Sequence, residues 1–141
     1  MNVIGTLLLA CVCGGENALP RTETGVVVCP QSAFRIPLDL TAEERSSVDA
    51  IRIFVSEDMG QSWVRMSDGA PDMKVITFRA RHDGEYWFIV TLIDGTGRQT
   101  PAHLEGVEPG LKVLVDTTKP AVTLKAIRSK SGRRGVRWTL D

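Results

Sequence analysis

Apolar and polar residues alternate through the middle of the chain, which is the periodicity of strands rather than of helices. The first run places Phe34, Ile36 and Leu38 on one side, and Pro37 restricts this strand to the edge of a sheet. Turn-forming residues such as Asp83-Gly84 separate the later runs. We therefore expect about seven short strands joined by tight turns. They span residues 33–40, 50–56, 62–66, 75–80, 85–93, 99–104 and 111–115.

Helical periodicity is weak in this sequence. Residues 41–44, Thr-Ala-Glu-Glu, have the spacing of a capping box and predict a single helical turn. No longer amphipathic helix is indicated. Many short strands with frequent turns and so little helix predict an all-β, antiparallel sandwich.

Residues 115–120 read VDTTKP and follow the last of these strands. The motif resembles the boundary between tandem immunoglobulin-like (Ig-like) or fibronectin type III-like domains of bacterial surface and periplasmic proteins. The resemblance implies one Ig-like sandwich over 33–118 and the start of a second over 119–141. Residues 121–127 and 135–140 are its first two strands. Because two strands cannot bury an apolar face alone, we expect a truncated second sandwich or strands that pair with something else.

Tyr86 carries a second resemblance to this class of domain. Ig domains place a tyrosine two residues before a core cysteine, with its hydroxyl bonded back to the backbone of the preceding corner. Here Phe88 stands where that cysteine would be. The fibronectin type III-like variant needs no such disulfide, so it is the better match. The resemblance implies a structural role for Tyr86.

Residues 56–63 read SEDMGQSW and match the Asp box, S-x-D-x-G-x-[ST]-W. The matching residues are Ser56, Asp58, Gly60, Ser62 and Trp63. Asp boxes occur on sialidase propellers and in other secreted β-proteins that act on or bind polysaccharides. A propeller typically needs at least about four blades, which one box in this chain cannot supply. We expect the Asp58 carboxylate to accept loop N–H groups, and the alternative is a contact to a ligand or Ca²⁺.

The first 15 residues hold a short apolar run followed by small residues. They are predicted to be a signal segment, and residues 16–32 a linker. No basic residue precedes the run, so a buried first strand or a wrongly chosen start codon stays open. Leu-Leu-Ala-Cys also resembles a lipobox in which Cys11 would be lipidated. The expected location is the periplasm, the cell surface or the medium.

Cysteine pairing depends on how this segment is processed. If residues 1–15 are removed, Cys29 is the only cysteine that stays and no disulfide within the chain is possible. If Cys11 is lipidated, Cys13 and Cys29 are both retained and are able to pair.

The sequence offers little chemistry of the kind that enzymes use. His82 and His103 are the only histidines, and neither has a nucleophile motif nearby. A zinc site has almost no ligands to draw on. Acidic pairs such as Glu57-Asp58 are expected to be solvated turn charges. We expect no enzymatic activity, no cofactor and no metal.

Charge is distributed unevenly along the chain. Residues 1–120 hold 11 basic and 16 acidic residues, and residues 121–141 hold 6 and 1. The basic residues of this tail are Lys125, Arg128, Lys130, Arg133, Arg134 and Arg137. We expect them on a solvated hairpin, with binding of an anionic glycan or lipid headgroup as the alternative.

Trp87 and Ile89 alternate with Tyr86 and Phe88, so they are expected on the outer face of the longest strand. An outward tryptophan can stack on sugars. With Asp58 and Trp63 these residues define a possible ligand surface. The alternative is that an adjacent domain or a loop covers them.

The function favoured by these patterns is non-catalytic. We expect an exported spacer, scaffold or adhesion module whose partners are adjacent domains or envelope proteins. Polysaccharide is a possible partner, whereas nucleic acid and a transmembrane span are not expected. The alternatives are an accessory carbohydrate-binding module and the N-terminal fragment of a larger enzyme.

Overall fold

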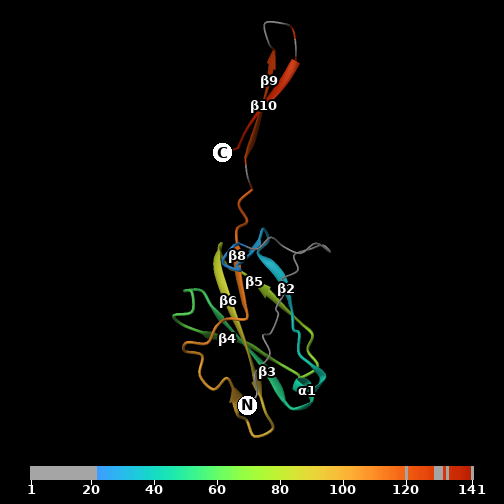
Figure 1. Ribbon diagram of the computed structural model, residues 1–141, viewed down its shortest axis with the longest axis vertical. Helices are drawn as coiled ribbons and strands as arrows, with labels where there is room; N and C mark the ends of the chain where they lie inside the picture. Colours follow the sequence, from blue (N-terminus) through green and yellow to red (C-terminus); the bar gives the residue numbers. More distant parts are fainter. Residues whose placement is uncertain (1–21, 120, 129–131, 133, 141) are drawn as a thin grey trace.

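The computed structural model describes residues 22–119, 121–128, 132 and 134–140, and in these residues the chain is predominantly β (Figure 1). The elements are β1 (Val27–Cys29), β2 (Ala33–Pro37), α1 (Ala42–Ser46), β3 (Ala50–Ser56), β4 (Val64–Gly69), β5 (Val75–Arg79), β6 (Gly84–Ile93), β7 (Gln99–Thr100), β8 (Leu111–Val115), β9 (Val122–Arg128) and β10 (Arg134–Leu140). The predicted all-β class is confirmed, and each predicted strand overlaps an observed one.

The strands form three sheets. The largest has the order β1-β8-β6-β3-β4, and β7 also pairs with β6. β2 pairs with β5, and β9 pairs with β10. All of these pairs are antiparallel except β1 with β8, which is parallel. The large sheet is therefore mixed, whereas the sequence predicted antiparallel pairing alone.

The predicted linker over residues 16–32 contains a strand. Val27–Cys29 forms β1, and its middle residue, Val28, stands opposite Leu114 of β8. Val27 and Cys29 are buried, with 2% and 0% exposure. A three-residue strand has too little alternation to be recognised, and its partner lies far away in the sequence. Residues 16–21 lie outside the described residues.

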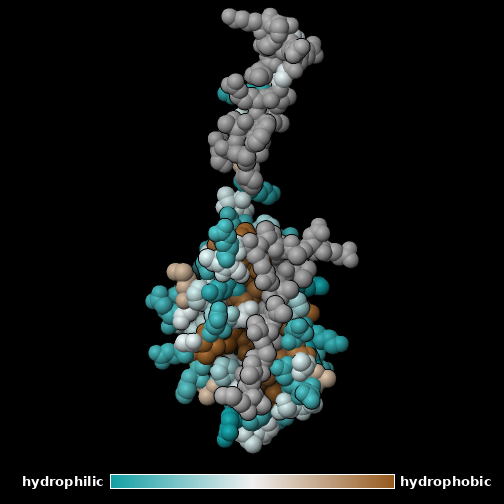
Figure 2. All heavy atoms as spheres, viewed as in Figure 1, coloured by the Kyte–Doolittle hydropathy of each residue, from teal (hydrophilic) through white to brown (hydrophobic). Residues whose placement is uncertain are grey.

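Side chains from the β2–β5 sheet and the large sheet share one hydrophobic core. Phe88 of β6 lies at its centre, where it meets Phe78 edge-on at 4.9 Å between ring centroids and Phe34 at 6.1 Å. Full burial of a phenylalanine contributes roughly 1.5–3 kcal/mol, so these three rings hold the two sheets together. Where Figure 2 colours the surface, hydrophilic residues predominate and hydrophobic patches lie between them.

The predicted helical turn is present as α1. Thr41 caps it through the Glu44 backbone N–H, and the Glu44 side chain accepts from the Thr41 backbone N–H, which completes the capping box. Arg45 then ties α1 to its surroundings, because its guanidinium donates to backbone carbonyls on two other segments. The acceptors are those of Leu38, Leu40, Pro71 and Met73.

The hairpin of β9 and β10 stands away from the other sheets in Figure 1. Among the described strands, each of its two strands pairs only with the other. The described part of the chain contains no helix with the length and hydropathy of a membrane span.

Candidate functional site

Residues 56–63 comprise the end of β3 and the loop that joins it to β4. The side chains of Ser56 and Asp58 organise this segment. The buried Ser56 hydroxyl donates to Asp58 Oδ1 at 2.7 Å and accepts from the Gly60 backbone N–H at 2.8 Å. Ser62 donates twice to Asp58, from its backbone N–H at 2.9 Å and from its hydroxyl at 2.5 Å. Both oxygens of Asp58 are therefore engaged by the loop itself.

These hydrogen bonds hold the pKa of Asp58 at about 2, below its ordinary value of 3.8. The Ser62 hydroxyl makes the largest contribution, followed by the Ser56 hydroxyl and the Ser62 backbone N–H. Because hydrogen bonds to the charged form favour it, Asp58 is ionised over the whole physiological range. A carboxylate that already accepts from three loop donors has less capacity left for a metal ion or a ligand.

Glycine is required at position 60 for two reasons, the backbone conformation there and the close approach of two indole rings. Its φ of +84° lies in the left-handed region, and a Cβ there would come within 3.0 Å of the Trp87 ring. The Trp63 ring would lie 3.7 Å from the same atom. Gly60 thus allows the loop to approach both indole rings.

Trp87 is half-buried and engaged on several sides. Its ring N–H donates to Glu85 at 2.6 Å, and the Lys112 ammonium lies 4.2 Å from the ring centroid in a cation–π contact. Ser56 and Lys112 are its cross-strand neighbours on β3 and β8. A sugar stacking on this ring would have to compete with the Lys112 contact and with the packing against Gly60.

Ile89 is not part of an accessible ligand surface, so that prediction was wrong. Its side chain is 3% exposed, and Thr91 on the same side of β6 is fully buried. Strand periodicity correctly separated Ile89 from the core that contains Phe88. It could not reveal that the outer face of β6 is also covered, because coverage depends on distant segments.

A groove of about 840 Å³ lies between β4 and β5. Val64 and Met66 line it from the β4 side, and Phe78, Arg79 and Arg81 line it from β5 and the residues that follow. We refer to it as the β4–β5 groove. Of the predicted ligand-surface residues it includes Asp58, whereas Trp63, Trp87 and Ile89 are not among its lining residues. No local pattern in the sequence predicts this groove, because the two strands belong to different sheets.

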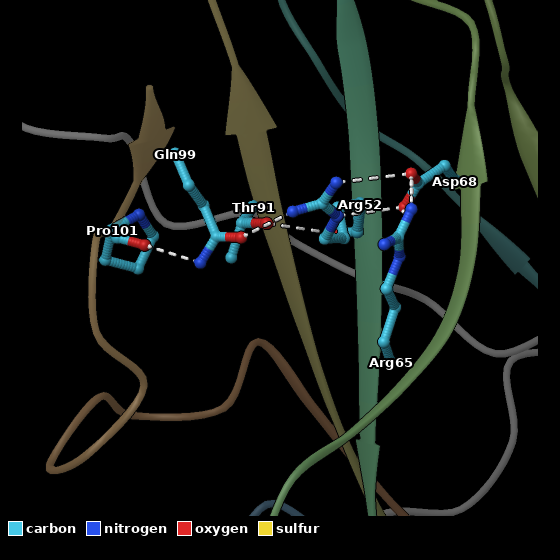
Figure 3. A network of polar contacts seen from close by, with 6 residues as sticks. All are labelled: Arg52, Arg65, Asp68, Thr91, Gln99 and Pro101. Carbon is cyan, nitrogen blue, oxygen red and sulfur yellow. Dashed lines mark hydrogen bonds and ion pairs between the residues drawn. The ribbon is translucent and has the colours of Figure 1, made fainter. Parts of the chain in front are cut away.

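A polar network crosses the large sheet next to this groove (Figure 3). Arg52 of β3 and Arg65 of β4 both bind the Asp68 carboxylate, and Arg52 also donates to Gln99 of β7 at 3.2 Å. The hydrogen bond from Arg52, then that from Arg65, lowers the pKa of Asp68. The network joins three strands, and the Asp68 carboxylate offsets one of the two guanidinium charges that it binds.

Four of the six basic residues of the tail lie on the strands β9 and β10. The register places Lys125 opposite Arg137 and Arg128 opposite Arg134. Lys125 is exposed. Lys130 and Arg133 lie outside the described residues.

The corner between β5 and β6 is closed by Tyr86. This residue is fully buried, and its hydroxyl donates to the His82 backbone carbonyl at 2.8 Å. The predicted bond from Tyr86 back to the corner backbone is therefore present. Its ring packs on Phe78 at 5.2 Å between centroids, so the corner is joined to the core.

The same corner binds the segment that leaves β8. Asp83 accepts from the backbone N–H and the hydroxyl of Thr117, each at 2.9 Å. Asp116 accepts in turn from the backbone N–H of Thr118 at 3.0 Å. The exit of the chain toward β9 is thus tied to residues 34 positions earlier in the sequence. The sequence predicts a boundary at this segment, but carries no signal for its attachment to Asp83.

Comparison with protein-family models and with curated proteins finds no match for this chain. Within the described residues, no group of three or more histidine, cysteine, aspartate or glutamate side chains is arranged to hold a metal ion. Cys29 is disulfide-bonded, and its partner lies outside the described residues.

Proposed function

We propose that this protein is a non-catalytic exported module, with an Ig-like or fibronectin type III-like sandwich that acts as a spacer, scaffold or adhesion unit. The observation that carries the proposal is the attachment of Thr117 to Asp83. A spacer must hold the unit that follows it in a defined orientation. Two hydrogen bonds at the point where the chain leaves the sheet limit the directions in which it can continue.

Three further features support this domain type. The Tyr86 hydroxyl closes a corner in the manner of the tyrosine corner of such sandwiches. Residues 115–120 carry the VDTTKP boundary motif. The hairpin of β9 and β10 then begins after the boundary and stands apart, as the opening strands of a following unit would. The structural role proposed for the Asp box at Asp58 rests on its saturation by loop donors.

Export is supported by Cys29. A buried disulfide persists in oxidising compartments such as the periplasm or the medium, and is rare where thiols are kept reduced. The other two cysteines, Cys11 and Cys13, lie in the signal segment expected over residues 1–15, so a disulfide within the chain fits lipidation at Cys11 with Cys13 retained, and not removal of the whole segment. The proposed partners are adjacent domains or envelope proteins.

Replacement of Thr117 by valine tests the spacer proposal. Thr117→Val keeps the size of the side chain and removes the hydroxyl that bonds to Asp83. We expect backbone ¹⁵N order parameters at residues 116–118 to match those of β8 in the unmodified protein and to fall in the variant. Thr118→Val is the matched control, because only the backbone of Thr118 bonds to Asp116. Order parameters typical of a free tail in the unmodified protein would contradict the proposal.

Tryptophan fluorescence separates the spacer from a carbohydrate-binding module. A spacer should show no saturable change when soluble neutral or anionic polysaccharides are added. A saturable change that disappears in Trp87→Ala would support carbohydrate binding instead, since stacking on an indole alters its emission.

A further inference from the structure

The β4–β5 groove lies between two strands with open edges. β4 is the last strand in the order of the large sheet, and β5 pairs only with β2 among the described strands. Each edge strand presents backbone N–H and C=O groups that have no strand partner on one side within the described residues. An extended chain placed between them can form main-chain hydrogen bonds with either edge.

The groove has apolar surface as well as open edges. Val64 lines it and is 64% exposed, which is unusual for a valine on an edge strand. Met66 lies two residues further along the same strand and also lines the groove. Side chains that alternate along an extended chain could bury part of this surface. Phe78 is the one aromatic residue of the lining and is itself 9% exposed, so no open ring is available for stacking a sugar or a base.

The charge at the β5 side of the groove is positive and uncompensated. Arg79 and Arg81 are exposed, and the guanidinium group of neither forms a hydrogen bond or an ion pair within the described residues. Arg65, by contrast, is bound by Asp68. On the other side, Asp58 accepts hydrogen bonds from neutral serine groups and keeps its negative charge, and Glu57 also lines the groove. The groove therefore has an acidic end at Glu57 and Asp58 and a basic side at Arg79 and Arg81, and carboxylates of a ligand would bind on the basic side.

We propose that the β4–β5 groove binds an extended acidic peptide segment of a partner protein by strand addition. Open strand edges supply main-chain bonds, Val64 and Met66 accept apolar side chains, and Arg79 and Arg81 bind carboxylates. This site goes beyond the spacer function and is independent of it, since the attachment of Thr117 to Asp83 uses none of these residues.

Titration with short peptides tests the proposal. The probe is a terminally blocked peptide of alternating valine and glutamate, as long as the six residues of β4. We expect saturable ¹⁵N chemical-shift changes at the amides of Val64, Met66, Thr77 and Arg79, weakening as salt is added. A peptide of alternating valine and lysine should bind at least about tenfold more weakly, because it meets like charge.

Charge-reversal variants locate the contact. Arg79→Glu with Arg81→Glu should reduce affinity for the glutamate peptide by at least about tenfold. The matched control is Arg35→Glu with Arg98→Glu, which makes the same change in net charge at exposed arginines outside the groove. Preserved amide spectra away from the groove show that each variant is folded.

Several results would overturn the proposal. They are absence of binding, equal binding of the lysine peptide, equal losses in the two double variants, or shifts confined to other strands. Tighter binding of a sulfated oligosaccharide at the same amides would also overturn it, and would assign the groove to an anionic glycan. Order parameters at residues 116–118 are unaffected by any of these results, so the spacer proposal is tested separately.

Discussion

At the scale of single residues, hydrogen bonds to a carboxylate organise the loop between β3 and β4. Asp58 is half-buried, and three donors from Ser56 and Ser62 surround it. The short side chain of aspartate reaches backbone N–H groups two to four residues away, which is why loops favour it. The same reach made the role of Asp58 predictable from residue spacing.

Loss of this carboxylate should destabilise the fold in a pH-dependent way. Asp58→Ala should lower the urea midpoint at pH 7, because the Ser62 and Ser56 donors lose their acceptor. The pKa of Asp58 is lowered to about 2 by folding, from 3.8. Its contribution is therefore complete above pH 4 and is lost as the pH falls through 2.

The stability difference between Asp58→Ala and the unmodified protein should thus shrink between pH 4 and pH 2. Urea unfolding followed by fluorescence at several pH values measures this difference. Asp39→Ala is the matched control, because Asp39 is exposed and forms no hydrogen bond within the described residues. A difference that stays constant down to pH 2 would mean that the loop does not depend on the ionised carboxylate.

Tyr86 offers a second test at this scale. Tyr86→Phe keeps the ring in the core and removes the bond to the His82 carbonyl, so it should cost roughly 1–2 kcal/mol of unfolding free energy. Chemical denaturation with an unchanged m-value measures the loss. If stability is unchanged, water satisfies the His82 carbonyl and the corner does not need the hydroxyl.

At the scale of elements, the alternation of apolar and polar residues predicted where strands lie, but not which segments cover their faces. The longest predicted run, residues 85–93, agrees closely with β6 (Gly84–Ile93). Alternation also assigned Ile89 to the face opposite the core. What it could not provide was the burial of that face or the short strand β1. Both depend on segments that approach from elsewhere in the chain.

The capping box shows where local information is sufficient. Thr41 and Glu44 satisfy each other's backbone groups within four residues, so the turn was predictable from the sequence alone. The bonds from Arg45 to Pro71 and Met73 span 26 and 28 residues. Nothing in the spacing of an isolated arginine indicates such acceptors.

At the scale of the whole molecule, processing and disulfide formation are linked. Cys29 is disulfide-bonded, and the other two cysteines of the chain lie in the predicted signal segment. Removal of residues 1–15 would leave Cys29 as the only cysteine, whereas lipidation at Cys11 would retain Cys13. The two routes therefore predict different thiol chemistry for the same domain.

Mass spectrometry of the polypeptide isolated from its source tests this link. If the signal is cleaved near residue 15, we expect a shortened chain with one cysteine that reacts only after denaturation, since Cys29 is buried. A lipid mass on Cys11 together with an intact disulfide would support the lipoprotein route. A chain that retains residues 1–15 without lipid would contradict the predicted signal.

The sequence by itself determined the strand-rich class, the turn positions and the capped turn α1, and it predicted that Asp58 accepts hydrogen bonds from its loop, although two of the three donors are serine hydroxyls rather than the backbone N–H groups expected. Each of these depends on groups within a few residues of one another, where spacing limits what can meet. Tertiary structure alone decided the parallel pairing of β1 with β8, the cover over Ile89 and the attachment of Thr117 to Asp83. It also placed β4 and β5 on either side of a groove. These features join residues that lie far apart in the chain, and a local pattern carries no information about which distant segments will meet.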